Sequence, residues 1–278
     1  MTERVWLITG VSSGLGSELM RVVASEGAIV AGTVRKEAQL KDVEGCVPGK
    51  THGYIMDVNN HAQVASVVKS VIDRFGRVDV LVNNAGYGLV GAVEETSMEE
   101  ARSQMETNFF GALAVTQAAL PAMRAAGAGH ILQISSIAGF VGAPGLGLYD
   151  ASKHALEGMS EALHHELKPH GIHVTIVEPG PFRTKWAGAS MKTVATSIDA
   201  YSETAGQMQR NLSQLSGNQP GDPERAAHQM LRAVNSDAPP LRLPLGAKAV
   251  AAISSKAQGV VANVEQWKEH SIAADFPA

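Results

Sequence analysis

Short apolar runs alternate along the chain with longer segments whose apolar residues recur at helical spacing. The runs are rich in β-branched residues, as is typical of buried strands, and they cover residues 5–9, 28–33, 53–56, 78–82, 130–135, 172–177 and 241–243. The helical segments cover residues 15–26, 61–75, 99–126, 149–169 and 222–235, and a final helix runs through Trp267. Strands and helices that alternate in this way form βαβ units. The pattern predicts an α/β fold with a doubly wound, mostly parallel sheet and helices on both faces.

Two segments depart from this rhythm. Residues 186–220 are rich in Ala, Ser, Thr, Gln and Met and favour neither a strand nor an uninterrupted helix. We expect them to form a mobile flap on the substrate side. Residues 246–278 continue past the last predicted strand, and we expect this C-terminal extension to close the substrate pocket or to alter assembly. The sequence contains no linker that would separate two domains, so residues 1–278 are predicted to form a single domain.

Composition and charge narrow the class of protein. Hydrophobic residues make up 45% of the 278 residues and charged residues 18%, which indicates a globular chain and excludes a disordered or fibrous one. The net charge of -4 comes without a basic or acidic block, so we expect neither a nucleic-acid nor a membrane partner. The only cysteine, Cys46, excludes an intrachain disulfide. The sequence shows no signal-peptide pattern and no apolar run of about 18 residues, and we expect a cytoplasmic location.

Three glycines follow the first predicted strand. Gly10, Gly14 and Gly16 stand at the junction with the first helix, where doubly wound sheets bind the phosphates of nucleotides. Glycine permits a tight turn there, lets the backbone approach a pyrophosphate and allows the helix to pack closely on the strand. The amino terminus of the helix adds unpaired N–H groups and the positive end of its dipole. The loop therefore predicts a dinucleotide site on a Rossmann-like sheet.

The spacing of this loop, Thr-Gly-x-x-x-Gly-x-Gly, differs from the general Gly-x-Gly-x-x-Gly fingerprint and resembles that of the short-chain dehydrogenase/reductase family. Further motifs of that family follow in its order between residues 5 and 184. They are Asn83-Asn84-Ala85-Gly86, Asn108 after Thr107, Tyr149-x-x-x-Lys153 with Ser136 thirteen residues before the tyrosine, and Pro179-Gly180. The resemblance implies an NAD(P)-dependent oxidoreductase that interconverts a ketone or aldehyde and an alcohol. It also implies a homodimer or homotetramer.

The expected catalytic residues are Asn108, Ser136, Tyr149 and Lys153. Tyr149 and Lys153 are four residues apart on a predicted helix, so their side chains leave the same face. A tyrosine has an ordinary pKa of about 10, which must fall for the phenol to act as a base near neutral pH. We expect the Lys153 ammonium and an oxidised nicotinamide to lower it, and we expect the phenol to donate a proton in the reducing direction. The Ser136 hydroxyl can hold a substrate carbonyl.

The resemblance implies two further roles that spacing does not show. Asn108 would help to hold a water molecule, and Lys153 would bind the nicotinamide ribose. Taken singly, Tyr149 and Lys153 fit an ordinary helix-surface pair, Ser136 fits a strand-end turn and Asn108 fits a polar position in a helix. Their joint occurrence behind the glycine loop favours catalysis. One alternative is a non-catalytic dinucleotide-sensing binding protein on the same fold. Another is a sugar-nucleotide epimerase or dehydratase, whose chains are usually longer and space their glycines differently.

The end of the second strand bears on the choice of cofactor. It contains Thr33, Arg35 and Lys36 and no acid that would accept from the 2′-hydroxyl of the adenine ribose. Arg35 can make forked, charge-assisted bonds to a 2′-phosphate. The family's other phosphate cue, a basic residue inside the glycine loop, is missing because Ser12 and Ser13 occupy that position. On the strength of Arg35 and the missing acid, NADP(H) is favoured and NAD(H) stays open. The full set of expected cofactor-binding residues is Gly10, Ser12, Ser13, Gly14, Leu15, Gly16, Thr33, Arg35, Asp57, Val58, Asn84, Ala85, Gly86, Tyr149, Lys153, Pro179, Gly180 and Thr184.

The resemblance also implies a substrate pocket that is mostly apolar, which favours a lipophilic small-molecule ketone or secondary alcohol. The expected pocket residues are Tyr87, Ile137, Phe140, Leu146, Pro181, Trp186 and Met191. We expect no metal site. His164, His165, Glu166 and His170 lack the His-Glu-x-x-His spacing of a metalloprotease helix, and they indicate a solvated helix end instead.

Overall fold

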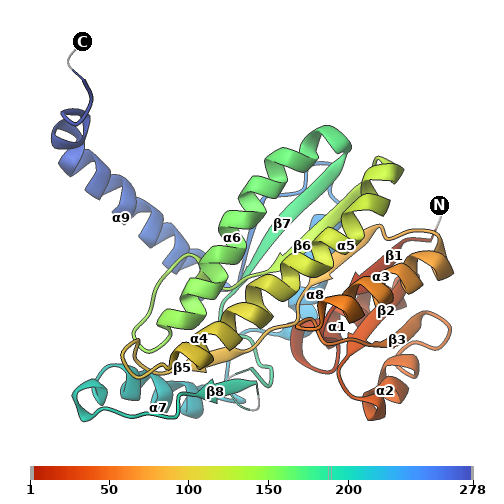
Figure 1. The fold of residues 1–278 in the computed structure, drawn as a ribbon, viewed down its shortest axis with the longest axis horizontal. Helices are drawn as coiled ribbons and strands as arrows, with labels where there is room; N and C mark the ends of the chain where they lie inside the picture. The colour runs from red at the N-terminus through yellow and green to blue at the C-terminus, as the bar shows by residue number, and fades with distance from the viewer. Residues whose placement is uncertain (1–2, 187, 189, 277–278) are drawn as a thin grey trace.

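The computed structural model describes residues 3–186, 188 and 190–276, and a parallel sheet of seven strands lies at its centre (Figure 1). Leu7 on the first strand is paired with Ala31 on one side and Leu81 on the other. The chain therefore runs outward to one edge and then restarts beside its first strand, which creates a crossover point there. In spatial order the strands are β3 (Thr51–Ile55), β2 (Ile29–Val34), β1 (Val5–Ile8), β4 (Val80–Asn83), β6 (Gly129–Ile134), β7 (Ile172–Pro179) and β9 (Arg242–Leu245).

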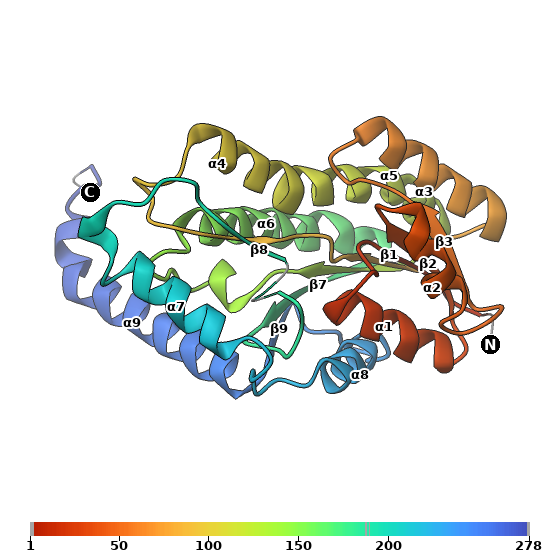
Figure 2. The ribbon, with the colours of Figure 1, turned by 90° about the horizontal axis from the view of Figure 1, so that it is seen from below.

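Helices cover both faces of this sheet (Figure 2). One face carries α1 (Gly14–Ser25) and α8 (Pro223–Val234). The other carries α3 (His61–Phe75), α5 (Gly111–Ala126) and α6 (Gly147–Leu167). Aliphatic side chains of the strands are buried on both sides, as a parallel sheet between two helical layers requires. The predicted doubly wound fold is confirmed.

Helix α3 shows how the apolar pattern becomes packing. The Asn60 side chain accepts a backbone N–H bond at its amino terminus, and Gly76, with φ of 75°, ends it in the left-handed conformation. Val64, Val68 and Val71 lie along one stripe and are buried against the sheet. The polar positions between them face solvent, so the helix is held mainly by this one apolar face.

The segment predicted as one helix over residues 99–126 consists of two helices. α4 (Met98–Met105) leads into a π-helical turn (Glu106–Phe110), and α5 follows. A π-helical turn fits one extra residue into the helical path and is frequent at functional sites. Here it carries Asn108, so the prediction of an uninterrupted helix is wrong at the position that bears the candidate polar group.

Residues 186–220 contain regular structure that the sequence pattern did not predict. β8 (Met191–Thr193) pairs in parallel with β5 (Gly88–Val90) as a second, two-stranded sheet, and α7 (Ala205–Leu215) follows. The expectation that this segment favours neither strand nor helix is wrong. A three-residue strand has too few positions to show an alternating pattern, and its order comes from its partner. A short helix, α2 (Leu40–Glu44), was also not predicted.

The segment past β9 is a single long helix, α9 (Ala247–Ile272), which projects from the body of the molecule (Figure 1). Ala249 near its start is buried, and the side chains from Gln258 onward are exposed as far as Phe276. Across the described ranges, none of the helices combines the length and apolar character that crossing a bilayer requires.

Candidate active site

The carboxyl ends of the central strands open into one cleft. Its walls are the loop after β1, the ends of β2 and β3, the turns after β4 and β6, the first turns of α6 and the segment after β7. Ligands bind at this edge of doubly wound sheets, beside the crossover point. Leu212 and Leu215 of α7 also line the cleft, so the segment after β7 contributes apolar surface to it.

The glycine loop brings backbone segments into close contact. Gly10 has φ of 71°, a conformation that favours glycine, and a Cβ on it would approach the Ala85 Cα to 3.0 Å. A Cβ on Gly16 would lie 2.3 Å from Asn84 Nδ2. That amide donates to the Gly10 carbonyl at 2.9 Å. Any larger residue at positions 10 or 16 would therefore separate the loop from the turn after β4.

The amino terminus of α1 faces the cleft. Ser13 is the N-cap of this helix, yet its side chain makes no capping hydrogen bond. The first N–H groups of a helix have no partner within the helix and carry the positive end of its dipole. Ser12, Ser13 and Gly14 all line the cleft. The loop therefore offers the donor set that a pyrophosphate needs, and its glycines leave room for one.

The end of β2 is fixed to the same loop. Thr33 is buried, and its hydroxyl accepts from the Gly10 N–H at 3.3 Å. Its carbonyl accepts from the Val11 N–H at 3.0 Å. Arg35, two residues further on, is exposed and lines the cleft together with Asp57. A cation thus stands at the end of the cleft nearest the second strand.

Tyr149 lies in the first turn of α6 and is only 4% exposed. Its ring centroid is 5.2 Å from that of Trp186. Burial raises the pKa of the phenol above its ordinary value of 10, and a hydrogen bond with Ser136 opposes this only in part. In the chain alone, loss of solvent therefore dominates the pKa of Tyr149, and the expected lowering by Lys153 together with an oxidised nicotinamide stays a prediction for the cofactor complex. At neutral pH the phenol keeps its proton.

Lys153 follows one turn later on the same face of α6. Its Nζ donates to the carbonyl oxygen of Ile134 at 2.7 Å, at the end of β6. Burial lowers the pKa of this lysine to about 8, and the nearby Glu157 carboxylate acts in the opposite direction. The side chain is therefore mostly an ammonium at pH 7, held in place by one strand-end carbonyl. Both Tyr149 and Lys153 line the cleft.

Asn108 in the π-helical turn acts as a structural link. Its Oδ1 accepts from the Tyr87 N–H at 3.1 Å. Its Nδ2 donates to the Tyr87 carbonyl at 3.0 Å and to the Ser152 hydroxyl at 3.1 Å. The side chain is 1% exposed and does not line the cleft. Asn108 therefore holds the turn after β4 against α6, behind the wall of the cleft.

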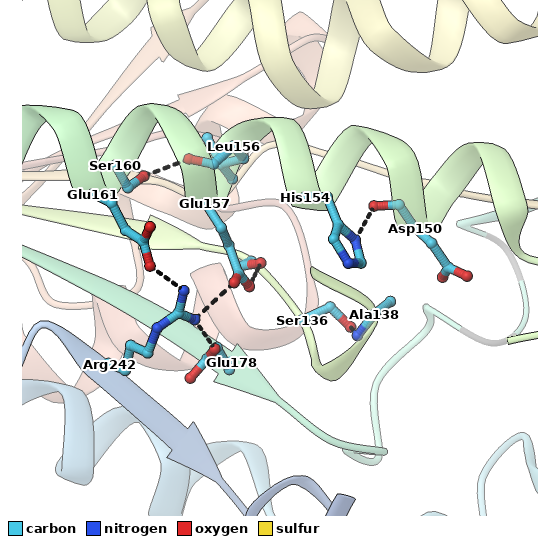
Figure 3. A network of polar contacts seen from close by, with 11 residues as sticks. Ser136, Ala138, Asp150, His154, Leu156, Glu157, Ser160, Glu161, Glu178 and Arg242 are labelled. Atoms are coloured by element: carbon cyan, nitrogen blue, oxygen red, sulfur yellow. Dashed lines mark hydrogen bonds and ion pairs between the residues drawn. The ribbon is translucent and has the colours of Figure 1, made fainter. Parts of the chain in front are cut away.

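A cluster of charged side chains surrounds Arg242 (Figure 3). Glu157, on the next turn of α6, accepts from the Ser135 hydroxyl at 2.6 Å and from Arg242 Nη1 at 2.7 Å. Arg242 of β9 also binds the carboxylates of Glu161 and Glu178. Glu178 on β7 is fully buried, and burial, together with the neighbouring Glu157, raises its pKa to about 7. The cluster joins α6, β7, β9 and the end of β6.

Most residues predicted at the site line this cleft. Those that do are Gly10, Ser12, Ser13, Gly14, Leu15, Thr33, Arg35, Asp57, Val58, Asn84, Ala85, Gly86, Tyr87, Ser136, Ile137, Leu146, Tyr149, Lys153, Pro179, Gly180, Pro181, Thr184 and Trp186.

Four predicted residues lie outside the lining. Gly16 and Asn108 support the walls from behind, as described above. Phe140, expected in the substrate pocket, lies beneath Arg242, whose guanidinium carbon is 5.0 Å from the ring centroid. Met191, also expected there, packs on the backbone of Gly88, where a Cβ would be 2.7 Å from the methionine Cε. Neither side chain lines the cleft in this structure, and their role in a substrate pocket stays a prediction.

The cleft also has lining residues that the motifs did not indicate. The largest group comes from the segment after β7: Phe182, Lys185, Ser190, Leu212, Leu215 and Gln219. Leu212 and Leu215, with Met208 before them, recur at intervals of four and three residues, as on one face of a helix. From that spacing, the helix α7 and its apolar contribution to the site could have been predicted.

Comparison with known proteins agrees with this geometry. A family model described as short chain dehydrogenase matches residues 4–195. The chain belongs to this family. Oxidoreductase BOA17 of Botryotinia fuckeliana is 38% identical and aligns over 97% of this chain and 98% of its own length. The 3-ketodihydrosphingosine reductase of Bacteroides thetaiotaomicron is 45% identical over 66% of each chain. A solved short-chain dehydrogenase from Streptomyces avermitilis, 39% identical, covers 98% of this chain and all of its own with a TM-score of 0.92.

Membership of the short-chain dehydrogenase family confirms the predicted family and reaction class. The chain is an NAD(P)-dependent oxidoreductase acting on a C–OH or C=O group. The match ends at residue 195, so the second half of the segment after β7, which includes α7, and the helix α9 lie outside it. These are the parts in which the family motifs carry least information about this chain.

Proposed function

We propose that this short-chain dehydrogenase reduces a lipophilic ketone or aldehyde to the alcohol, with NADPH as the reductant and Tyr149 as the proton donor. The observation that carries the proposal is the buried phenol of Tyr149, which stays protonated at neutral pH beside the Ser136 hydroxyl. Support for a lipophilic substrate comes from the apolar lining, which includes Leu146, Trp186 and Leu212. The relative from Bacteroides thetaiotaomicron is a reductase named for 3-ketodihydrosphingosine, a keto compound.

The cleft residues fit a nicotinamide dinucleotide. The glycine loop and the amino terminus of α1 would hold the pyrophosphate, because they offer backbone donors and no Cβ at the closest approach. Asp57 and Val58 would lie beside the adenine, and Pro179, Gly180 and Thr184 beside the nicotinamide. When bound, the cofactor supplies the hydride that is added to the carbonyl carbon.

The side chains at the inner end of the cleft would then handle the oxygen and its proton. Ser136 donates a hydrogen bond to the carbonyl oxygen and orients it, and the Tyr149 hydroxyl gives its proton to the same oxygen as the carbon is reduced. The Lys153 ammonium stabilises the phenolate that remains. We assign Asn108 a positioning role, because all its side-chain hydrogen bonds go to Tyr87 and Ser152.

We further propose that residues 186–220 act as the substrate-side flap of a single domain. Trp186 and α7 both contribute lining to the cleft. β8 holds one end of this segment, since the Val194 N–H donates to the Val90 carbonyl at 3.0 Å. The flap would therefore move as a unit about its two ends, and closure would exclude water from the carbonyl and from Tyr149.

A screen of carbonyls with both cofactors tests the proposed function. We expect oxidation of NADPH in the presence of lipophilic ketones or aldehydes. Because each extra buried methylene contributes about 0.8 kcal/mol, kcat/KM should rise several-fold per methylene along an alkyl ketone series until the pocket is filled. Turnover confined to small charged carbonyls, or no dependence on chain length, would contradict the assignment of a lipophilic substrate.

Arg35 provides a separate test of the cofactor. Replacing Arg35 by Asp should reduce the preference for NADPH over NADH, measured as the ratio of kcat/KM values, by about 100-fold. The change removes a charge-assisted hydrogen bond of about 1.5–3 kcal/mol and places a carboxylate against the phosphate. Lys41→Asp, which reverses an exposed charge on α2, is the matched control and should leave the ratio unchanged. An unchanged ratio in the Arg35 variant would show that this residue does not select the cofactor.

A further inference from the structure

Helix α9 concentrates the exposed apolar surface of the molecule. Of the ten large hydrophobic side chains found exposed in the described part of the chain, six belong to this helix. They are Val250, Val260, Val261, Val264, Trp267 and Ile272, each about half exposed or more, between 48% and 63%. Scattered exposed apolar residues are normal, but a contiguous group of this kind marks an interaction surface.

These side chains form one stripe that is only partly covered. Ile253, Ala257, Val260, Val264 and Trp267 recur at alternating intervals of four and three residues, the spacing of a helix that packs along a partner helix. The first two are partly buried, where the helix still lies near β9 and the turn after β6. From Val260 onward, the described part of the chain leaves the side chains of the same stripe about half exposed or more. The second half of this apolar stripe is therefore available to pack against another molecule.

The opposite face of α9 is polar. Ser255, Gln258, Glu265 and Glu269 lie on it and are exposed. Ala262 occupies the same face, roughly midway along the helix. The helix is therefore two-sided along the length that leaves the body, with one face suited to water and the other to a partner.

We propose that α9 is a dimerisation helix that pairs antiparallel with α9 of a second copy of this chain. An antiparallel two-fold arrangement centred at the height of Ala262 sets Val260 against Val264 and Ala257 against Trp267. The largest side chain of the stripe thus meets a small one, which is how packed layers fill space. The distal, uncovered half of each stripe lies on the proximal half of the other. The surface is self-complementary in this register, and no different partner is needed to cover it.

A membrane surface is a poorer occupant of this stripe. Helices that lie in the bilayer interface carry a polar face rich in Lys and Arg. α9 carries Lys248, Lys256 and Lys268 as well as Glu265 and Glu269, so its charges are of mixed sign, and the whole chain has a net charge of -4. Such a mixture of charges lacks the dense cationic face that holds a helix on an anionic bilayer, whereas the pairing of two identical helices requires no attraction between opposite charges.

Sedimentation velocity of the full chain and two variants tests the proposal. Val264→Lys places a charge in the centre of the stripe, and lysine forms helices better than valine, so the helix itself is not weakened. We expect the mass of the assembly to fall at least by half. Ala262→Lys introduces the same charge two residues away on the polar face, and it should keep the wild-type mass. Far-UV circular dichroism checks that both variants stay folded.

Three outcomes would overturn the proposal. The first is a wild-type chain that sediments as a monomer at micromolar concentration. The second is a Val264→Lys variant with the wild-type mass. The third is co-sedimentation of a monomeric wild type with phosphatidylglycerol vesicles that is lost in Val264→Lys, which would assign the stripe to a membrane.

A double variant tests the register of the pairing. Val260→Lys combined with Val264→Glu should restore the dimer that each single change disrupts, since antiparallel pairing places the two new charges opposite each other.

Discussion

Replacing Tyr149 by Phe should reduce kcat for carbonyl reduction by about 1,000-fold while the cofactor still binds. The substitution keeps the aromatic ring that packs at 5.2 Å from Trp186 and removes the hydroxyl beside Ser136. A positioned proton donor accounts for about 100- to 10,000-fold in rate. The loss should appear in kcat, because the proton is transferred only as the carbonyl is reduced. Stopped-flow measurement of a single turnover gives the rate of carbonyl reduction, and a separate titration checks that the cofactor still binds.

Tyr87 supplies the matched control for this variant. It is a second phenol that lines the same cleft, with the Lys192 ammonium 4.4 Å from its ring centroid. Tyr87→Phe should change kcat by no more than about tenfold, the effect of one neutral hydrogen bond. If the two variants lose rate equally, or if Tyr149→Phe keeps the wild-type kcat, Tyr149 is not the proton donor. A variant that neither turns over nor binds cofactor would instead indicate a damaged fold.

Replacing Arg242 by Leu should lower the free energy of unfolding by about 3 kcal/mol at pH 8. The change removes the cation that binds Glu157 and Glu178, two carboxyl groups that are 3% and 0% exposed. Taking one partner from a buried ion pair costs about 3–5 kcal/mol, because the remaining charge is left without compensation. The lower end applies because the arginine side chain is itself 28% exposed. Urea unfolding of the wild type and the variant measures the difference.

The effect of this substitution should depend on pH. The pKa of Glu178 lies at about 7, above its ordinary value of 4.5, so the fold favours the protonated carboxyl. The stability that this preference contributes is complete below pH 4.5 and is lost as the pH rises through 7. Without the Arg242 cation the pKa of Glu178 rises further, so the loss becomes larger. The variant should therefore approach the wild type at pH 5 and fall furthest below it at pH 8.

Arg225→Leu is the control for the loss of an arginine. This residue pairs with Asp222 on the surface and its side chain is 87% exposed, so its removal should cost less than about 1 kcal/mol at either pH. A similar loss in the two variants, or a loss in Arg242→Leu that does not grow with pH, would show that the buried cluster does not behave as described.

The sequence predicts the sheet and most of the cleft, for a physical reason. Buried parallel strands are continuous apolar runs, and the glycine loop has few alternatives to Gly10, whose φ of 71° other residues rarely adopt. Local constraints of this kind are visible in a single chain. The resemblance then places Tyr149 and Lys153, which both line the cleft.

The parts that the sequence does not predict depend on contacts between distant segments. β8 is a strand only because it pairs with β5, about a hundred residues earlier. The rise in the Tyr149 pKa comes from burial beneath residues such as Trp186, which a helical spacing of four cannot reveal. Phe140 and Met191 have the right character for a pocket but face Arg242 and Gly88. The direction in which a side chain points depends on contacts that form only in the folded protein.

The two-stranded sheet of β5 and β8 joins the turn after β4 to the segment that carries α7. β5 begins two residues after the Asn83-Asn84-Ala85-Gly86 turn, and the Gly88 N–H donates to the Ser190 carbonyl at 3.1 Å, where the segment that carries α7 passes. A molecule that displaces this segment must therefore pull on the turn that packs against the glycine loop. Displacement of the segment by a substrate would then change the affinity for the cofactor, and by thermodynamic reciprocity the cofactor would change the affinity for the substrate by the same factor.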